Sequence, residues 1–165
     1  MIDRMEVIKV GIADMNIVYP PSVIRTAGLG SCVGVVLYDP WKQIAGMVHV
    51  MLPDSALAKE GQLNSAKYAD TGVRELVRKL GDEGARISSL KAKIAGGAQM
   101  FQFSSSNDLM RIGPRNVEAV KQALYDLRIE LLAEDCGGNS GRTIEFNPKT
   151  SLLTIRTVNK GMRDI

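Results

Sequence analysis

Two apolar stretches, Cys-Val-Gly-Val-Val-Leu-Tyr at residues 32–38 and Ile-Ala-Gly-Met-Val-His-Val-Met-Leu at residues 44–52, decide the fold of this chain. Both are almost continuously apolar and contain many β-branched residues, a pattern typical of strands buried on both faces. Between them lies Asp39-Pro40-Trp41-Lys42, a good turn sequence with proline where a type I turn favours it. The two stretches therefore predict a hairpin in the core of a sheet.

Apolar patterns elsewhere predict further strands and two helices. The first helix is expected to begin at Asn64 or Ser65, either of which can cap it, and to end at Gly81. The second is expected to begin near Pro114, which fits the first helical position. Strands that precede helices interleaved with further strands indicate an α+β class and one domain over residues 1–165. The other strands are expected at 5–12, 15–19, 90–95, 129–135, 143–146 and 152–158, the last two joined as a hairpin.

Composition argues against several classes of protein. A net charge of +3, dispersed basic residues and 5% aromatic residues do not indicate a nucleic-acid binder. No apolar run approaches the ~20 residues that span a bilayer, and the charged first ten residues lack a signal-peptide core. We therefore expect no membrane insertion and a cytoplasmic location, where the two cysteines would be free thiols.

Chemistry is indicated by Cys32 and by His49, the only histidine of the chain. A turn centred on Pro40-Trp41 predicts a register that places Cys32 directly opposite His49, where a thiol and an imidazole can meet. The imidazole could then take the thiol proton, and the thiolate could attack an amide carbonyl. Thr26 is a candidate for the group that orients the base. Gly28, Gly30 and Ser31 precede the cysteine and could let backbone amides approach a substrate oxyanion.

Simpler interpretations of the same residues remain open. A cysteine or a lone histidine on an apolar strand is more often a core residue than a catalytic one. What favours catalysis is the combination of the glycine-rich segment, the shared face and the absence of a second histidine. Cys136 has no histidine left to partner it and is expected to be a buried thiol. One histidine, two distant cysteines and no carboxylate cluster predict no metal site.

The sequence resembles the CheD family of chemoreceptor glutamine deamidases over nearly its whole length. The motifs that carry this resemblance lie in the family's order along the chain. They are Thr26-Ala-Gly-Leu-Gly-Ser-Cys-Val-Gly34, Gly46-Met-Val-His-Val-Met-Leu-Pro-Asp54, Lys67-Tyr-Ala-Asp70, Gly96-Gly-Ala-Gln-Met-Phe101, Ile112-Gly-Pro-Arg-Asn-Val117, Asp135-Cys-Gly-Gly138 and Gly141-Arg142. Two departures, Ser151 and Cys136, do not touch the positions of the expected catalytic residues.

The resemblance implies a cysteine hydrolase whose triad falls on Cys32, His49 and Thr26. It implies conversion of selected receptor glutamines to glutamates, with no cofactor and with a CheC-type phosphatase as regulatory partner. It also implies packed mixed β-sheets flanked by two main helices, as in deamidating bacterial toxins. Two other functions stay open: a non-catalytic adaptor that binds receptors or the phosphatase, and a transamidase in which an amine replaces water.

Overall fold

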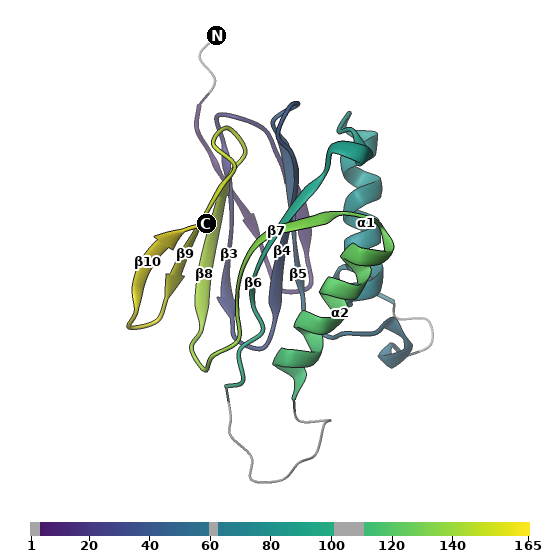
Figure 1. Ribbon diagram of the computed structural model, residues 1–165, viewed down its shortest axis with the longest axis vertical. Coiled ribbons are helices and arrows are strands. Elements are labelled where there is room, and N and C mark those ends of the chain that lie inside the picture. The colour runs from purple at the N-terminus through teal and green to yellow at the C-terminus, as the bar shows by residue number, and fades with distance from the viewer. Residues whose placement is uncertain (1–3, 60–62, 101–110) are drawn as a thin grey trace.

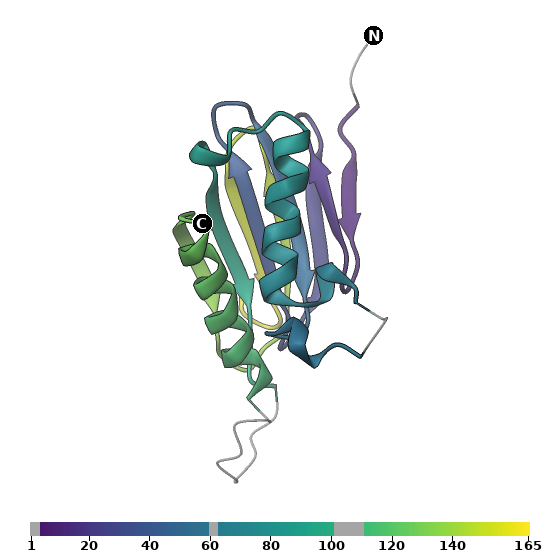
Figure 2. The same ribbon diagram turned by 90° about the vertical axis from the view of Figure 1, so that its right-hand side faces the viewer.

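The protein is built from two five-stranded β-sheets and two helices, in a computed structural model that describes residues 4–59, 63–100 and 111–165. The sheets lie face to face, and both helices cover the outer face of one of them (Figure 1; Figure 2). The described elements are β1 (Val7–Val10), β2 (Met15–Val18), β3 (Val23–Leu29), β4 (Val33–Asp39), β5 (Ile44–Val50), η1 (Ser55–Leu57), η2 (Ser65–Lys67), α1 (Ala69–Asp82), η3 (Ile87–Ser89), β6 (Lys91–Gly96), α2 (Ile112–Asp126), β7 (Glu130–Cys136), β8 (Arg142–Asn147), β9 (Leu152–Thr157) and β10 (Gly161–Asp164), where η marks a 3-10 helix.

Both sheets are mixed, as an α+β fold with packed mixed sheets requires. The first has the strand order β1-β3-β8-β9-β10, and only its β1–β3 pair is parallel. The second has the order β2-β5-β4-β6-β7, and only its β6–β7 pair is parallel. Helices α1 and α2 pack on this second sheet, which leaves its other face against the first sheet (Figure 2).

Two apolar cores follow from this layering, and β4 and β5 contribute to both. Every residue of these two strands is buried. Val35 and Val48 face the helices, whereas Val36 and Met47 face the first sheet. The continuous apolar runs at 32–38 and 44–52 are explained by this position, because a strand between two layers has no polar face.

The predicted hairpin is present, but the predicted register is wrong. Gly34, and not Cys32, lies opposite His49. The loop spans residues 40–43, because the side chain of Asp39 accepts hydrogen bonds from the N–H groups of Trp41 and Lys42, and Gln43 adopts a positive φ of 55°. This loop is centred one residue later than predicted, which shifts the pairing by two positions and so preserves the predicted face of each side chain.

Other boundaries differ from those that the sequence predicted. Strands β3 and β10 were not expected, because glycine and polar residues interrupt their apolar patterns. Asn64 caps the short helix η2, with its side chain accepting from the Ala66 N–H, so α1 begins only at Ala69. Helix α2 begins at Ile112, two residues before Pro114. The predicted hairpin at Asn147-Pro148-Lys149 is confirmed as the β8–β9 connection.

Candidate functional site

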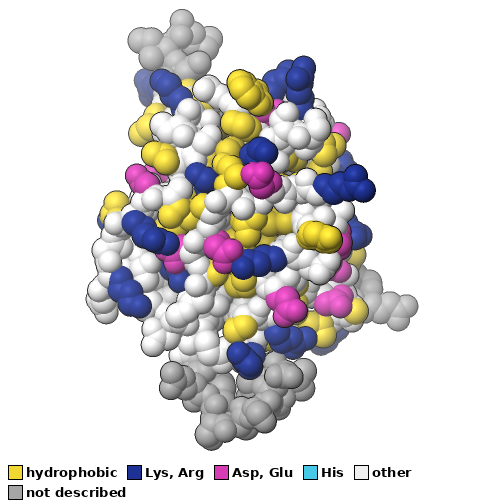
Figure 3. Space-filling view, in the orientation of Figure 1, with side chains coloured by type: hydrophobic (Ala, Val, Ile, Leu, Met, Phe, Trp, Pro, Cys, Tyr) yellow, Lys and Arg dark blue, Asp and Glu magenta, His cyan; other side chains and the backbone are white. Residues whose placement is uncertain are grey.

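Thr26 and His49 meet between the two sheets. Thr26 belongs to β3 in the first sheet and His49 to β5 in the second, and both side chains are buried. The Thr26 Oγ1 atom lies 2.7 Å from His49 Nδ1 and 2.7 Å from the Val10 carbonyl oxygen. The only histidine is thus held in a fixed ring orientation by a hydroxyl of the facing sheet, and no histidine is visible on the face shown in Figure 3.

The hydrogen bonds of Thr26 determine the tautomer of His49. A carbonyl oxygen can only accept, so the single hydroxyl proton of Thr26 is donated to Val10. The Thr26 oxygen must then accept from the imidazole, which places the ring proton on Nδ1. Nε2 consequently keeps its lone pair. It is buried and has no hydrogen-bond partner among the described residues, so it is available to take a proton.

Burial also sets the charge of the imidazole. Desolvation lowers the pKa of His49 from 6.5 to about 4, because the charged form is disfavoured in an enclosed site. His49 is therefore neutral at pH 7. A neutral imidazole with a bare Nε2 has the protonation state that a general base needs.

Cys32 lies in the short connection between β3 and β4. Its side chain is half-buried and packs against the core between the sheets. The same core contains Met47, which precedes His49 by two residues in β5. It precedes Val33, the first paired residue of β4, so Cys32 and His49 are diagonal neighbours on one face and are not directly opposed. The described residues show no hydrogen bond between the Cys32 thiol and Nε2. Burial raises the pKa of the thiol, partly offset by a backbone hydrogen bond.

The backbone around Cys32 is held by the segment that follows β6. The N–H of Gly97 donates to the Cys32 carbonyl, and the N–H of Ala98 donates to the Gly30 carbonyl, both at 2.8 Å. Gly96 makes this approach possible, since a Cβ there would lie 2.3 Å from the Cys32 carbonyl oxygen. The glycine at 96, directly after the predicted strand at 90–95, therefore has a steric reason.

The glycine-rich segment before Cys32 is partly a strand. Gly28 lies within β3 with a positive φ of 73°, at a register shift between Thr26 and Leu29. The Gly30 N–H donates to the Gly28 carbonyl at 3.1 Å, so this amide is already occupied. Ser31 and Cys32 form the bend that leads into β4. The Gly30 N–H, one of the backbone amides proposed to bind a substrate oxyanion, is therefore already used in a hydrogen bond within the protein.

Sequence reasoning assigned no role to three polar residues that hold this region. Asn116 of α2 is fully buried and donates to the carbonyls of Ser31 and Met51. Arg142 of β8 forms an ion pair of 3.0 Å with Asp135 and donates to the carbonyls of Gly96 and Gly137. Their sequence signal is weak, because a buried polar residue in a helix or at a strand end looks like a surface residue.

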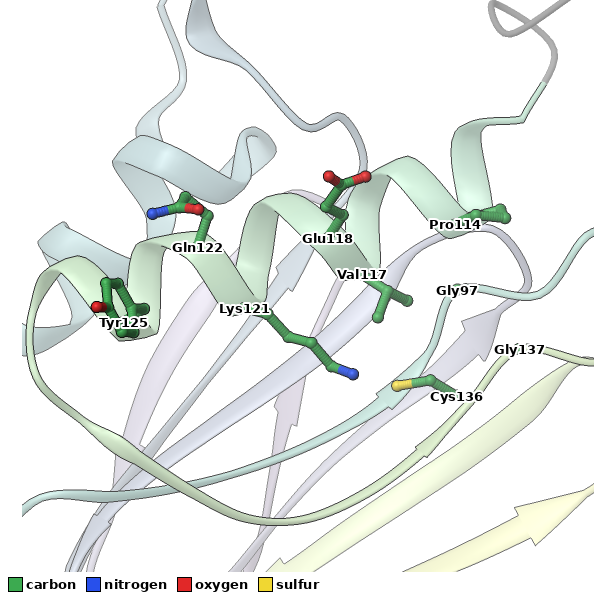
Figure 4. Close-up of a pocket in the computed structure, with 9 residues that line it drawn as sticks. All are labelled: Gly97, Pro114, Val117, Glu118, Lys121, Gln122, Tyr125, Cys136 and Gly137. Carbon is green, nitrogen blue, oxygen red and sulfur yellow. The ribbon is translucent and has the colours of Figure 1, made fainter.

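A separate pocket of about 680 Å³ lies between α2 and β7 and is not lined by Thr26, Cys32 or His49. Figure 4 shows the Cys136 sulfur facing it, with the Lys121 side chain reaching over from α2. Burial, with the nearby charge of Glu134, raises the pKa of Cys136 to about 12, so this thiol is protonated at neutral pH. Cys136 is half-buried and free.

The described residues form neither a cluster of metal ligands nor a membrane-spanning helix. Within 4–59, 63–100 and 111–165, no three His, Cys, Asp or Glu side chains come together as metal ligands would. Neither helix of the described chain is long and apolar enough to cross a membrane. The surface in Figure 3 shows acidic and basic side chains of both signs intermixed on this face.

Comparison with known proteins gives consistent results. The family model CheD, described as CheD chemotactic sensory transduction, matches residues 51–157. A chemoreceptor glutamine deamidase CheD from Halalkalibacterium halodurans is 64% identical over 160 residues, which cover 97% of this chain and 99% of that protein. The Bacillus subtilis protein of the same name is 60% identical, covering 96% of each chain. A probable chemoreceptor glutamine deamidase from Lachnoclostridium phytofermentans is 62% identical, covering 97% of this chain and 99% of its own.

Proposed function

The chain belongs to the CheD family, and on that premise we propose that it hydrolyses the side-chain amide of selected glutamines in chemoreceptors. Relatives that align over almost their whole length are named chemoreceptor glutamine deamidases, which supports this substrate. The observation that carries the proposal is the buried Thr26–His49 contact. It leaves a bare Nε2 on the face of the sheet that Cys32 shares.

The proposed reaction begins with a neutral pair. The pKa of Cys32 is raised and that of His49 is lowered, so thiol and imidazole are both uncharged before substrate binds. As the Cys32 sulfur attacks the amide carbon, Nε2 of His49 takes the thiol proton and then gives it to the leaving nitrogen. Ammonia departs and a thioester remains. Water, deprotonated by the same Nε2, cleaves the thioester and releases glutamate and the free thiol.

Thr26 acts through His49 in this scheme. Because it accepts from Nδ1–H, it keeps Nε2 unprotonated and stabilises the imidazolium that forms during attack. Ser31 and Gly28 remain proposed as parts of the substrate loop next to Cys32, whereas the N–H of Gly30 is occupied by Gly28. No cofactor enters any step.

Ammonia release from a receptor cytoplasmic fragment tests this function. Cys32→Ala and His49→Ala should each abolish it, while Cys136→Ser is the matched control and should retain it. Cys136 has a pKa of about 12 and no histidine partner, so its loss removes a thiol but no reactive group. Undiminished ammonia release in Cys32→Ala or His49→Ala would eliminate the mechanism. Labelled amine in the receptor product would instead indicate transamidation.

Several wider expectations rest on the sequence alone: residue pattern and composition carry the first two, and the family resemblance carries the others. We propose one domain over residues 1–165, a cytoplasmic location, a fold related to the deamidating bacterial toxins and a CheC-type phosphatase as regulatory partner. An adaptor function without chemistry is the second candidate from the same resemblance. It predicts that Cys32→Ala preserves both receptor binding and signalling output, whereas the deamidase function predicts that binding survives and the output is lost.

A further inference from the structure

Asn116 connects the two chain segments that carry the proposed nucleophile and base. Its Nδ2 atom lies 2.9 Å from the Ser31 carbonyl oxygen and 2.9 Å from the Met51 carbonyl oxygen. Ser31 directly precedes Cys32, and Met51 follows His49 by two residues. The β4–β5 pairing stops at Val33 and Val50, so the amide joins the strands just beyond their last pair.

We infer that Asn116 is a positioning residue, which fixes the Cys32 thiol relative to His49 Nε2 by holding both segments with one amide group. This inference deepens the proposed deamidase function and rests on it. The two contacts consume both hydrogens of the amide nitrogen. Because both neighbours are carbonyl oxygens, only the nitrogen side of the amide can face them, which settles the orientation of the side chain.

The burial of Asn116 argues against a role in stability alone. The residue is 0% exposed, and its Oδ1 atom has no hydrogen-bond partner among the described residues. An unpaired buried amide oxygen destabilises the fold. An apolar side chain of similar size would avoid that penalty but could not bind two carbonyls. The asparagine instead provides two directional hydrogen bonds, which fix the position of the end of β5 relative to the loop before β4.

The start of α2, which carries Asn116, packs closely against the segment that follows β6. Gly113, in the first turn of α2, packs so closely that a Cβ there would lie 2.2 Å from the Ala98 carbonyl oxygen. Ala98 and Gly97 in turn bind the carbonyls of Gly30 and Cys32. These backbone bonds do not involve the Asn116 side chain. A variant at 116 should therefore keep the loop attached to the fold while it loses the fine alignment of Cys32.

Asn116→Asp tests this inference, because it keeps the size of the side chain but presents only oxygens to the two carbonyls. Gln122→Glu is the matched control: it makes the same chemical change on the same helix at an exposed residue. We expect kcat for ammonia release to fall about 100-fold in Asn116→Asp, with KM nearly unchanged, as for a misplacement of about 1 Å. Gln122→Glu should keep the kcat and KM of the wild type.

Alkylation of Cys32 by iodoacetamide, followed by peptide mass spectrometry, gives a readout that does not need the receptor. In the wild type, His49 assists the thiol, so the rate should be nearly flat from pH 6 to pH 8. In Asn116→Asp the rate should rise about tenfold per pH unit, as for an unassisted thiol. A merely structural role would leave the wild-type slope in the folded protein.

The outcomes separate the inference from the function on which it rests. Wild-type kcat and a wild-type alkylation slope in Asn116→Asp would overturn the inference while leaving deamidation intact. If the wild type releases no ammonia, the proposed function fails, and the alkylation slopes alone decide whether Asn116 positions Cys32. If Asn116→Asp does not fold, Asn116→Ala removes the contacts without a buried charge and is judged by the same slopes. Failure of both variants to fold would show that Asn116 is required for folding, and it would overturn the inference.

Discussion

At the scale of single residues, one hydroxyl group decides what the only histidine can do. Thr26 has one proton, and the Val10 carbonyl receives it, so His49 must donate from Nδ1. A hydroxyl in this position directs the tautomer without adding a charge, unlike the aspartate of many catalytic triads. The neighbouring environment then keeps the imidazole neutral, with a pKa of about 4. Direction and neutrality together suit Nε2 to the proposed role of base.

Thr26→Val removes the oxygen and keeps the shape of the side chain. The Nδ1–H group of His49 would then be buried without its acceptor, and we expect a loss of about 1–3 kcal/mol in the free energy of unfolding. Ammonia release should fall at least tenfold, because the tautomer is no longer fixed. Thr26→Ser retains the hydroxyl and should stay within a few-fold of the wild type. Equal activities of the valine and serine variants would contradict this role of the hydroxyl.

The lowered pKa of His49 predicts how stability depends on pH. The unfolded chain binds the histidine proton near pH 6.5, whereas the folded chain binds it only near pH 4. Between these values the unfolded state holds more protons, so the free energy of unfolding should decrease as the pH falls through this window. His49 is the only histidine, so His49→Gln should remove the decrease between pH 7 and pH 5.5. Urea unfolding at several pH values measures it, and an unchanged slope in the variant would count against the buried neutral state.

At the scale of elements, the site depends on how closely the end of β6 approaches the Cys32 loop. Gly96 combines a positive φ of 113° with a Cβ position only 2.3 Å from the Cys32 carbonyl oxygen. Gly84 has a similar φ of 100°, with open space around it. Substitutions at the two glycines therefore separate the effect of backbone strain from that of steric displacement of the loop that carries Cys32, the proposed nucleophile.

Gly96→Ala should lower ammonia release by about tenfold or more and should also destabilise the fold. The added methyl group must push the Cys32 backbone away, and small displacements of reacting groups have large effects on rate. Gly84→Ala carries only the strain of a positive φ, of the order of 1 kcal/mol, and should keep the activity of the wild type. Comparable loss of activity in both variants, at equal stability, would refute the steric explanation.

Element boundaries show where sequence reasoning worked and where it failed. The apolar runs of β4 and β5 predicted a buried hairpin, because a strand that is buried on both faces is recognisable from its continuously apolar sequence. The register failed because the turn depends on the side chain of Asp39 and on a left-handed Gln43, neither of which residue type alone reveals. Strand β3 was not expected because the glycine at its bulge, Gly28, interrupts the apolar pattern.

Some features of the candidate site could likewise be predicted from the sequence, and others could not. Cys32, His49 and Thr26 were proposed from residue chemistry and from the resemblance, and of these the structure brings Thr26 and His49 into direct contact. Asn116 was missed because its contacts join segments far apart in sequence, and no local pattern records them. The diagonal relation of Cys32 to His49 was also beyond the sequence, because a shift of two positions leaves every apolar face unchanged.

At the scale of the whole molecule, the site lies where the first sheet meets the end of the second. Arg142 of β8 crosses between them: its guanidinium pairs with Asp135 of β7 and donates to the carbonyls of Gly96, the last residue of β6, and of Gly137, which follows β7. Both partners are largely buried, with side-chain exposures of 7% for Arg142 and 16% for Asp135. This ion pair therefore connects the two layers next to the segment that holds Cys32.

Arg142→Ala should lower the free energy of unfolding by about 3 kcal/mol, since it leaves Asp135 with less compensation for its burial. Arg25→Ala is the matched control, because it breaks an exposed pair with Glu145 on the same sheet and should change the stability by less than about 1 kcal/mol. Urea denaturation of both variants provides the comparison. Similar losses in the two would show that Arg142 is no more important than a surface charge.

The most direct test of the central claim is peptide-resolved mass spectrometry of a receptor cytoplasmic fragment after incubation with the protein. Glutamine hydrolysis through Cys32 predicts that selected glutamines become glutamates with the wild type and with Cys136→Ser, and that none do with Cys32→Ala. The same glutamines converted at an undiminished rate by Cys32→Ala would contradict it.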